Sequence, residues 1–203
     1  MIIRELKSSG SEHITLILED GQEIPTTLGI VTELRLCAGK PLEEAQLRLV
    51  REKTSFALTR ERALNLLTLR PHSQKELLDK LLRKGADPAA AEAAVCWLSE
   101  HGYLNDASYA SSVARHYAKK GYGVKRITSE LFRRGIPREL WEDALSELPE
   151  TDDELDRLLR SRLKHPDNPD EVRRVSAALS RRGYSWEEIR KALNRFSIDP
   201  EDF

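Results

Sequence analysis

The chain has 203 residues, of which 33% are charged and only 6% are aromatic, a mixture that favours amphipathic helices with solvated outer faces over a sandwich of strands. A net charge of -1 excludes a uniformly basic nucleic-acid binder. Positive and negative charges are nevertheless separated along the chain. Residues 115–134 carry seven basic residues and one acid, whereas residues 136–156 carry one basic residue and nine acids.

Residues 1–55 are predicted to form a small N-terminal subdomain. In residues 13–18 polar and apolar side chains alternate weakly and β-forming residues are frequent. Asp20-Gly21, a common hairpin turn pair, follows shortly after, so a β-hairpin is expected there. Residues 28–36 have the character of a helix. Residues 42–51, which follow Pro41, are again helical in character and lead towards the next segment.

Further helices are predicted from apolar periodicity, capping residues and glycine stops. They cover residues 56–69, 73–84, 88–101, 106–120, 123–134, 137–148, 152–164, 169–182 and 185–196. Several starts have the spacing of a capping box, namely Ser73 with Glu76, Thr151 with Glu154, Asn168 with Glu171, and Ser185 with Glu188. Asp87-Pro88 and Pro137 mark two more starts.

A basic pair followed by glycine recurs at Arg83-Lys84-Gly85, Arg133-Arg134-Gly135 and Arg181-Arg182-Gly183. Each triplet follows a helix-period apolar run, so each glycine is expected to end a helix in the left-handed region. In the second repeat the run that is expected to bury one face includes Val124, Ile127, Leu131 and Phe132. A repeat near 50 residues predicts stacked helical units.

The predicted fold is therefore all-α, with three tandem three-helix repeats in an elongated, curved array behind the N-terminal subdomain. The expected limits are residues 1–55 for the subdomain and 56–105, 106–150 and 151–203 for the repeats. The acidic stretch over residues 148–154 is interpreted as a solvated linker and helix start.

An ordered set of short motifs resembles the RecX family of RecA regulators. Its first part is Arg70-Pro71-His72-Ser73, Glu76-Leu77, Gly85, Gly102-Tyr103-Leu104-Asn105-Asp106 and Tyr109-Ala110. Its second part is Lys120-Gly121, Gly123, Arg126-Ile127, Glu130-Leu131 and Gly135-Ile136. The resemblance covers roughly residues 56–148, and the third repeat, with Gly183, matches more loosely. His72 stands where the family commonly has arginine, which puts one basic contact in doubt.

The resemblance implies a cytoplasmic regulator without enzymatic activity or cofactor. Such a protein lies in the helical groove of the RecA filament on DNA, bridges protomers and inhibits the recombinase and ATPase activity of RecA in homologous recombination, DNA repair and the SOS response. It implies weaker, salt-dependent binding to single- and double-stranded DNA, no membrane contact and a monomeric state. The N-terminal subdomain is similar to the extension of longer family members.

The residues themselves offer basic candidates for binding RecA or DNA. They are Lys75, Arg83, Lys84, Arg115, Lys119, Lys120, Lys125, Arg126, Arg133, Arg134, Arg173, Arg174, Arg181 and Arg182. Arg126 and Arg133, like Arg174 and Arg181, lie seven residues apart, so they share one helix face about 10 Å apart. Planar guanidinium groups in that arrangement suit phosphates and carboxylates.

A structural explanation stands beside the binding one. The basic pairs before the glycines also complement the negative end of the helix dipole, which is worth about 0.3–1 kcal/mol each. That explanation fails for Lys125-Arg126 and Arg173-Arg174, which lie in a first turn, so these four are the better candidates. Trp97, Trp141 and Trp186 are expected to pack between units rather than to stack on bases.

No feature points to an enzyme. The histidines have no metal-site spacing, Cys37 and Cys96 form no C-x-x-C pair, and neither a Walker sequence nor G-x-S-x-G occurs. No apolar run reaches the roughly 20 residues of a membrane span, and no signal peptide is expected. Two alternatives stay open: a DNA-binding module of helix-turn-helix type that needs no recombinase, and a helical scaffold that collects protein partners.

Overall fold

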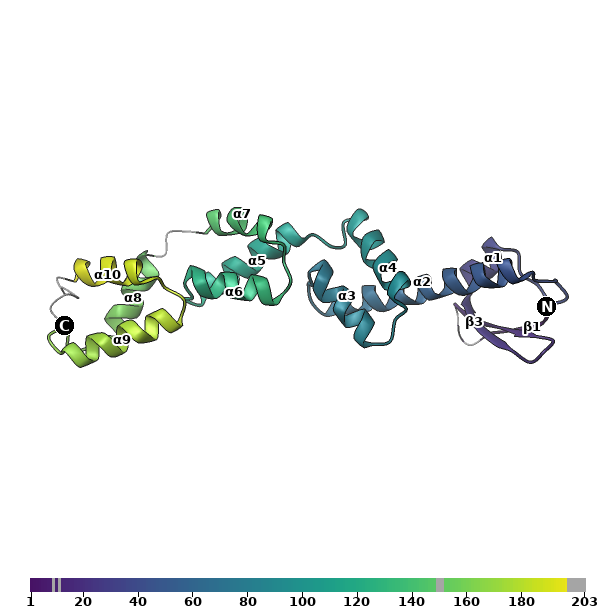
Figure 1. Cartoon of the computed structure of the whole chain (residues 1–203), viewed down its shortest axis with the longest axis horizontal. Helices are drawn as coiled ribbons and strands as arrows, with labels where there is room; N and C mark the ends of the chain where they lie inside the picture. Colours follow the sequence, from purple (N-terminus) through teal and green to yellow (C-terminus); the bar gives the residue numbers. More distant parts are fainter. Residues whose placement is uncertain (9, 11, 149–151, 197–203) are drawn as a thin grey trace. The chain divides into compact units, whose positions relative to one another are not determined.

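The computed structural model describes residues 1–8, 10, 12–148 and 152–196. The chain divides into two compact units (Figure 1). The first contains Met1–Pro71 and Leu77–Leu104, and the second contains His72–Glu76 and the chain from Asn105 onward. None of the described helices is long and apolar enough to cross a membrane. The predicted helical repeats behind a small N-terminal β-element are confirmed.

The first unit begins with an antiparallel sheet in the order β1-β2-β3. Its strands are β1 (Ile3–Ser8), β2 (His13–Leu18) and β3 (Glu23–Thr27). The predicted hairpin is β2–β3, in which Gly21 takes a φ of 83° at the turn. Strand β1 was not predicted, because most of its side chains are charged or polar and only Ile3 is fully buried.

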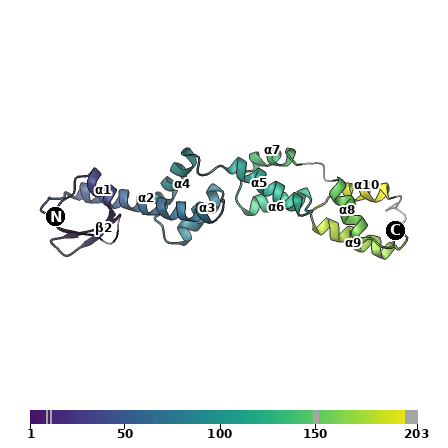
Figure 2. The same ribbon diagram turned by 180° about the vertical axis from the view of Figure 1, so that it is seen from behind.

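Two helices pack on this sheet. Helix α1 (Leu28–Glu33) is shorter than predicted, because Arg35 takes a positive φ of 49° after it. Helix α2 (Glu44–Leu69) is one continuous helix of 26 residues, whereas the sequence had indicated separate segments. Its Thr54 hydroxyl bonds to the Thr26 hydroxyl of β3 at 2.8 Å. Helix α2 thus leads from the sheet into the first repeat (Figures 1 and 2).

The first repeat is completed by α3 (Gln74–Arg83) and α4 (Pro88–Glu100). Asp87 accepts a hydrogen bond from the Ala90 amide at 3.0 Å, which confirms the predicted start of α4. The guanidinium group of Arg60 lies 4.7 Å from the centre of the Trp97 ring. The core of this repeat consists of Ala63, Leu77, Leu81, Ala91, Val95, Leu98 and Leu104.

The second unit contains two more repeats. The second repeat has α5 (Asp106–Lys119), α6 (Val124–Arg133), a 3-10 turn η1 (Arg138–Leu140) and α7 (Trp141–Ser146). The third has α8 (Asp152–Arg162), α9 (Pro169–Arg181) and α10 (Trp186–Arg195). Each repeat has its own apolar core. The predicted start at Thr151 lies outside the described residues.

Three predicted core residues are exposed. Val124 is 38% exposed and Phe132 is 66% exposed, because α6 buries only the side that carries Ile127, Glu130 and Leu131. Trp186, predicted to pack between units, is 57% exposed. It opens α10, and helical side chains tilt towards the N-terminus, so its indole extends beyond the apolar core. Packing between units was therefore the wrong interpretation for this tryptophan.

Candidate functional site

The second and third repeats meet through two glycines. The turn after α9 lies against the start of α6 (Figure 1), where the Gly123 amide donates to the Arg182 carbonyl at 3.0 Å and the Lys125 amide donates to the Gly183 carbonyl at 3.1 Å. A Cβ atom on Gly123 would lie 2.4 Å from the Gly183 carbonyl carbon, and one on Gly183 would lie 2.4 Å from the Arg126 amide nitrogen. Both positions therefore require glycine, because the two backbones are in direct contact.

Arg182 ties the same junction together through its side chain. Its Nε donates to the Gly121 carbonyl at 3.0 Å, and its Nη2 donates to the Lys120 carbonyl at 2.8 Å. The guanidinium group lies 5.0 Å from the centre of the Tyr122 ring, within cation–π range. The second arginine of this basic pair is therefore engaged inside the fold.

These contacts gather basic residues that are far apart in the sequence. We call Lys119, Lys120, Lys125, Arg126, Arg181 and Arg182 the junction cluster. All except the half-buried Arg182 are exposed. Within the described part of the chain none of the six forms a salt bridge; the neighbouring acid Glu154 pairs with Arg157 at 2.9 Å. The cluster is a concentrated positive surface that favours binding of an anion.

Within the second unit, the start of α3 receives the turn after α6 through the same kind of contact with different chemistry, and we call this contact the first junction. The Ser73 hydroxyl donates to the Arg134 carbonyl and accepts from the Glu76 amide at 3.0 Å, so it caps α3 and holds the turn after α6 at once. A Cβ on Gly135 would lie 2.6 Å from Cδ of Lys75. The Gln74 amide donates to the buried Asp106 carboxylate at 2.9 Å, and burial raises the pKa of that carboxyl.

Near this first junction both arginines of the basic pair are bound by one internal carboxylate. Glu130 is only 4% exposed and accepts from Arg133 Nε at 3.0 Å and from Arg134 Nε at 3.0 Å. The hydrogen bond from Arg133, followed by those from Tyr117 and Arg134, lowers the pKa of Glu130 to about 2. Arg134 also donates to the Tyr109 hydroxyl. Glu130 offsets one of the two guanidinium charges, so this end of α6 carries less net positive charge than the basic pair alone.

Sequence reasoning missed the role of Glu130. The signal was a carboxylate three and four residues before the basic pair, on the side of α6 that carries Ile127 and Leu131. Arg126 and Arg133 do lie on one helix, as predicted, but Arg133 is bound to Glu130 while Arg126 lies against Gly183. The structure thus separates this pair into two chemical environments.

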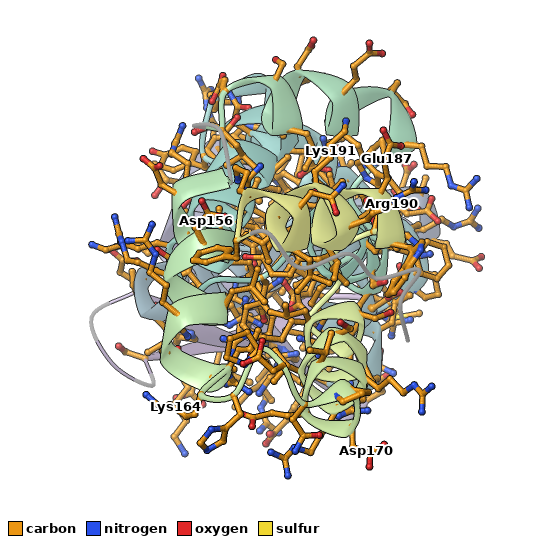
Figure 3. The ribbon with its side chains drawn as sticks, turned by 90° about the vertical axis from the view of Figure 1, so that its left-hand side faces the viewer. Asp156, Lys164, Asp170, Glu187, Arg190 and Lys191 are labelled. Carbon is orange, nitrogen blue, oxygen red and sulfur yellow. The ribbon has the colours of Figure 1, made fainter. Side chains whose placement is uncertain are left out.

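The remaining basic candidates lie apart from the junction cluster. Arg115 pairs with Glu147 at 2.9 Å, and Arg173 pairs with Asp170 at 3.7 Å. Arg174 is exposed on α9. Asp170 lies at the start of α9, whereas the junction is at its end. Figure 3 shows Asp170, together with Glu187, Arg190 and Lys191 on α10. Charges of both signs mix there, and Lys191 pairs with Glu187 at 2.9 Å. Arg83 and Lys84, in the first unit, are also exposed.

The remaining motif residues are structural. Gly85, Gly102, Gly121, Gly135 and Gly183 all have positive φ, as predicted for the three helix-ending glycines among them. Leu104 and Tyr109 are buried. Tyr103 is exposed and stacks on Trp97 with ring centres 5.9 Å apart. Arg70 donates to the Pro71 carbonyl at 2.9 Å.

Three-helix units that stack through glycine turns define a helical-repeat protein. Family models described as "RecX, first three-helix domain" and "RecX, second three-helix domain" match residues 60–98 and 105–145. The proteins named Regulatory protein RecX from Vibrio campbellii and from Xanthomonas axonopodis pv. citri are 35% and 38% identical to this chain over 148 and 143 residues. These alignments cover 71% and 68% of this chain and 93% and 87% of the relatives. The chain belongs to the RecX family.

Solved structures support the same fold. A crystal structure of regulatory protein RecX matches with a TM-score of 0.76 at 19% identity, covering 96% of this chain and 98% of that one. The RecX structure from Lactobacillus salivarius matches with a TM-score of 0.65 at 21% identity, covering 70% of this chain and 97% of that one. The resemblance inferred from the sequence motifs is confirmed, and the relatives are named as regulatory proteins.

Proposed function

We propose that this protein binds a RecA recombinase filament on DNA and inhibits its recombinase and ATPase activity in DNA repair and the SOS response. Membership of the RecX family supports the regulatory role. The observation that supports the site is the junction cluster, in which stacking of two repeats concentrates six basic side chains without an internal salt bridge in the described chain. The protein would act in the cytoplasm by binding alone, as a monomer and without a cofactor.

The junction cluster is built on a backbone that hydrogen bonds hold in place. Arg182 Nη2 donates a hydrogen bond to the Lys120 carbonyl at 2.8 Å, and the Lys125 amide donates one to the Gly183 carbonyl at 3.1 Å. The cationic side chains therefore project from a fixed backbone. Lysine and arginine side chains on such a base neutralise phosphates or partner carboxylates. Binding to bare DNA would be weaker and salt-dependent, with a slope of about -0.9 for each phosphate that is neutralised.

The test is the single-strand-dependent ATPase of the cognate RecA at rising concentrations of this protein. We expect the wild type to suppress the ATPase, and a variant combining Lys120→Gln, Lys125→Gln, Arg126→Gln and Arg181→Gln to require at least about tenfold more protein for the same effect. A matched control removes four exposed cations elsewhere, through Arg4→Gln, Lys7→Gln, Arg48→Gln and Lys164→Gln.

Circular dichroism and urea unfolding establish that both variants are folded. Equal suppression by the cluster variant and the control variant would remove the junction cluster from the mechanism. No suppression by the wild type would contradict filament regulation itself. DNA binding that is the same with and without RecA would then favour the module that reads DNA directly, and partner binding that DNA does not affect would favour the scaffold.

A further inference from the structure

The outer face of α6 combines cations with an exposed aromatic ring. Phe132 is 66% exposed, although the apolar pattern of α6 predicts it in the core. Lys125 precedes it by seven residues, which is nearly two helical turns, so the two side chains share one face about 10 Å apart. The acid of this helix, Glu130, is 4% exposed and lies on the buried side. The outer face of α6 therefore carries positive charge and an accessible ring.

Cations are present at both ends of α6. Its start carries Lys125 and Arg126, two exposed members of the junction cluster. At its end the exposed Lys75 lies against Gly135, where a Cβ would come within 2.6 Å of Lys75 Cδ. The ring-stacking and cation–π contacts seen among the described residues involve other rings, so none of them occupies a face of Phe132. The ring is therefore accessible to a ligand that the cations hold.

The middle helices of the other two repeats lack this combination. At the position of Phe132 the first repeat has Leu82, which is 39% exposed, and the third repeat has Ser180. The first repeat also has an acid, Glu76, at the position of Arg126. An aromatic ring on a cationic helix face is therefore particular to the second repeat. Packing that all three repeats share does not account for it.

The chemistry of this face fits a single strand of nucleic acid. Each nucleotide presents a phosphate, which lysine and arginine neutralise, and a flat base, which stacks on an aromatic ring. In a duplex the bases stack on each other, so contact with Phe132 would require costly unstacking. The carboxylates of a protein surface would satisfy the cations but give no reason for the ring. Single-stranded nucleic acid is thus the ligand that uses both features.

We infer that a single strand of nucleic acid runs along the outer face of α6, with phosphates on the cations at its ends and a base stacked on Phe132. This inference rests on the proposed function, and it identifies the anion at the junction cluster as single-stranded nucleic acid. The contact with Phe132 makes binding depend on the bases, whereas phosphate contacts alone do not. Binding to an oligonucleotide without bases separates the two contributions.

The test measures binding of the whole chain to fluorescein-labelled oligo(dT) and to an abasic oligonucleotide of the same length, which keeps the phosphates but has no bases. Fluorescence anisotropy gives both affinities. We expect Phe132→Ala to weaken binding to oligo(dT) by about fivefold or more, as for the loss of one stacked base, and to leave binding to the abasic oligonucleotide within about twofold. Phe132→Trp keeps a stacking ring and should bind oligo(dT) at least as tightly as the wild type.

Leu82→Ala is the matched control, because it removes an exposed apolar side chain at the equivalent position of the first repeat. We expect it to change neither affinity by more than about twofold. Both Phe132 and Leu82 are exposed, so their replacement by alanine opens no cavity in a core. Urea unfolding of each variant verifies that it is folded.

Three results would overturn the stacking contact. The first is equal binding of oligo(dT) by Phe132→Ala and the wild type. The second is an equal loss on oligo(dT) and on the abasic oligonucleotide, because the ring would then act through the cations or the fold. The third is normal oligo(dT) binding by Phe132→Ala with loss of RecA ATPase suppression, which would assign Phe132 to a protein contact. Failure of the wild type to suppress that ATPase would contradict the proposed function, and the oligonucleotide titrations would still decide the stacking contact.

Discussion

The glycine contact between the second and third repeats yields a prediction in which three alanine substitutions separate two physical costs. Gly85 has a φ of 80° and open space around it, so Gly85→Ala carries only the cost of left-handed backbone. Gly123 has an ordinary φ of -76°, but its Cβ would lie 2.4 Å from Gly183, so Gly123→Ala carries only a clash. Gly183→Ala carries both.

The expected magnitudes follow from these geometries. Left-handed backbone costs a residue with a side chain about 1–2 kcal/mol. Forcing a methyl group into a packed site costs about 1–3 kcal/mol. We therefore expect Gly183→Ala to lower the free energy of unfolding by about 2–5 kcal/mol. The gain from a less flexible unfolded chain is common to all three substitutions and cancels in the comparison.

Urea unfolding gives the global free energies, and amide hydrogen exchange locates the change. The amides of Gly123 and Lys125 donate across the junction, so their protection reports its opening directly. We expect Gly123→Ala and Gly183→Ala to reduce the protection of the Lys125 amide, and Gly85→Ala to leave it unchanged. If Gly183→Ala and Gly85→Ala destabilise the protein equally, the steric argument for the junction is refuted.

Two further predictions concern the first junction. Ser73→Ala removes both the cap of α3 and the hydrogen bond to the Arg134 carbonyl, so it should lower the free energy of unfolding in urea by about 2–4 kcal/mol. Ser185→Ala removes a cap alone and should lower it by about 1 kcal/mol. Equal losses in the two variants would contradict the role of Ser73 at the first junction. Glu130 has a pKa lowered from 4.5 to about 2 in the folded state, so its contribution of about 3 kcal/mol is present above pH 4.5 and is lost as the pH falls through 2. The stability difference between the wild type and Glu130→Gln should therefore shrink over that range, and a difference that does not depend on pH would rule out the ionised carboxylate as its source.

The helical repeats could be predicted because their signals are local. A glycine that ends a helix depends on the φ of one residue, and the values at Gly85, Gly135 and Gly183 agree with the prediction. The capping box at Ser185 and the cap at Asp87 depend on neighbours within three residues. Strand β1 lacked such a signal, because a charged edge strand is defined only by its pairing with β2.

The roles of the basic residues could not be predicted, because they depend on how one repeat stacks on another. In the sequence Arg133, Arg134, Arg181 and Arg182 are equivalent helix-ending pairs. In the structure Arg134 pairs with Glu130 of its own helix, whereas Arg182 reaches the Lys120 carbonyl of the preceding repeat. A distance of 62 residues along the chain leaves no periodic trace of that contact.

Comparison of the two junctions shows that, of the basic residues at the second, only Arg182 forms a side-chain hydrogen bond across it among the described residues. In both junctions a glycine turn packs on the start of a middle helix. At the first junction Glu130 binds Arg133 and Arg134. A second buried acid, Asp106, caps α3 there. The second junction achieves the same contact through backbone hydrogen bonds, and only Arg182 adds a side chain to it. The charged groups of Lys125, Arg126 and Arg181 therefore add mutual repulsion without a salt bridge or side-chain hydrogen bond across the junction among the described residues. We propose that this surplus serves an anion outside the chain, which is why charge at the second junction, rather than the stacking common to both, is the part of this fold to which we attribute the proposed function.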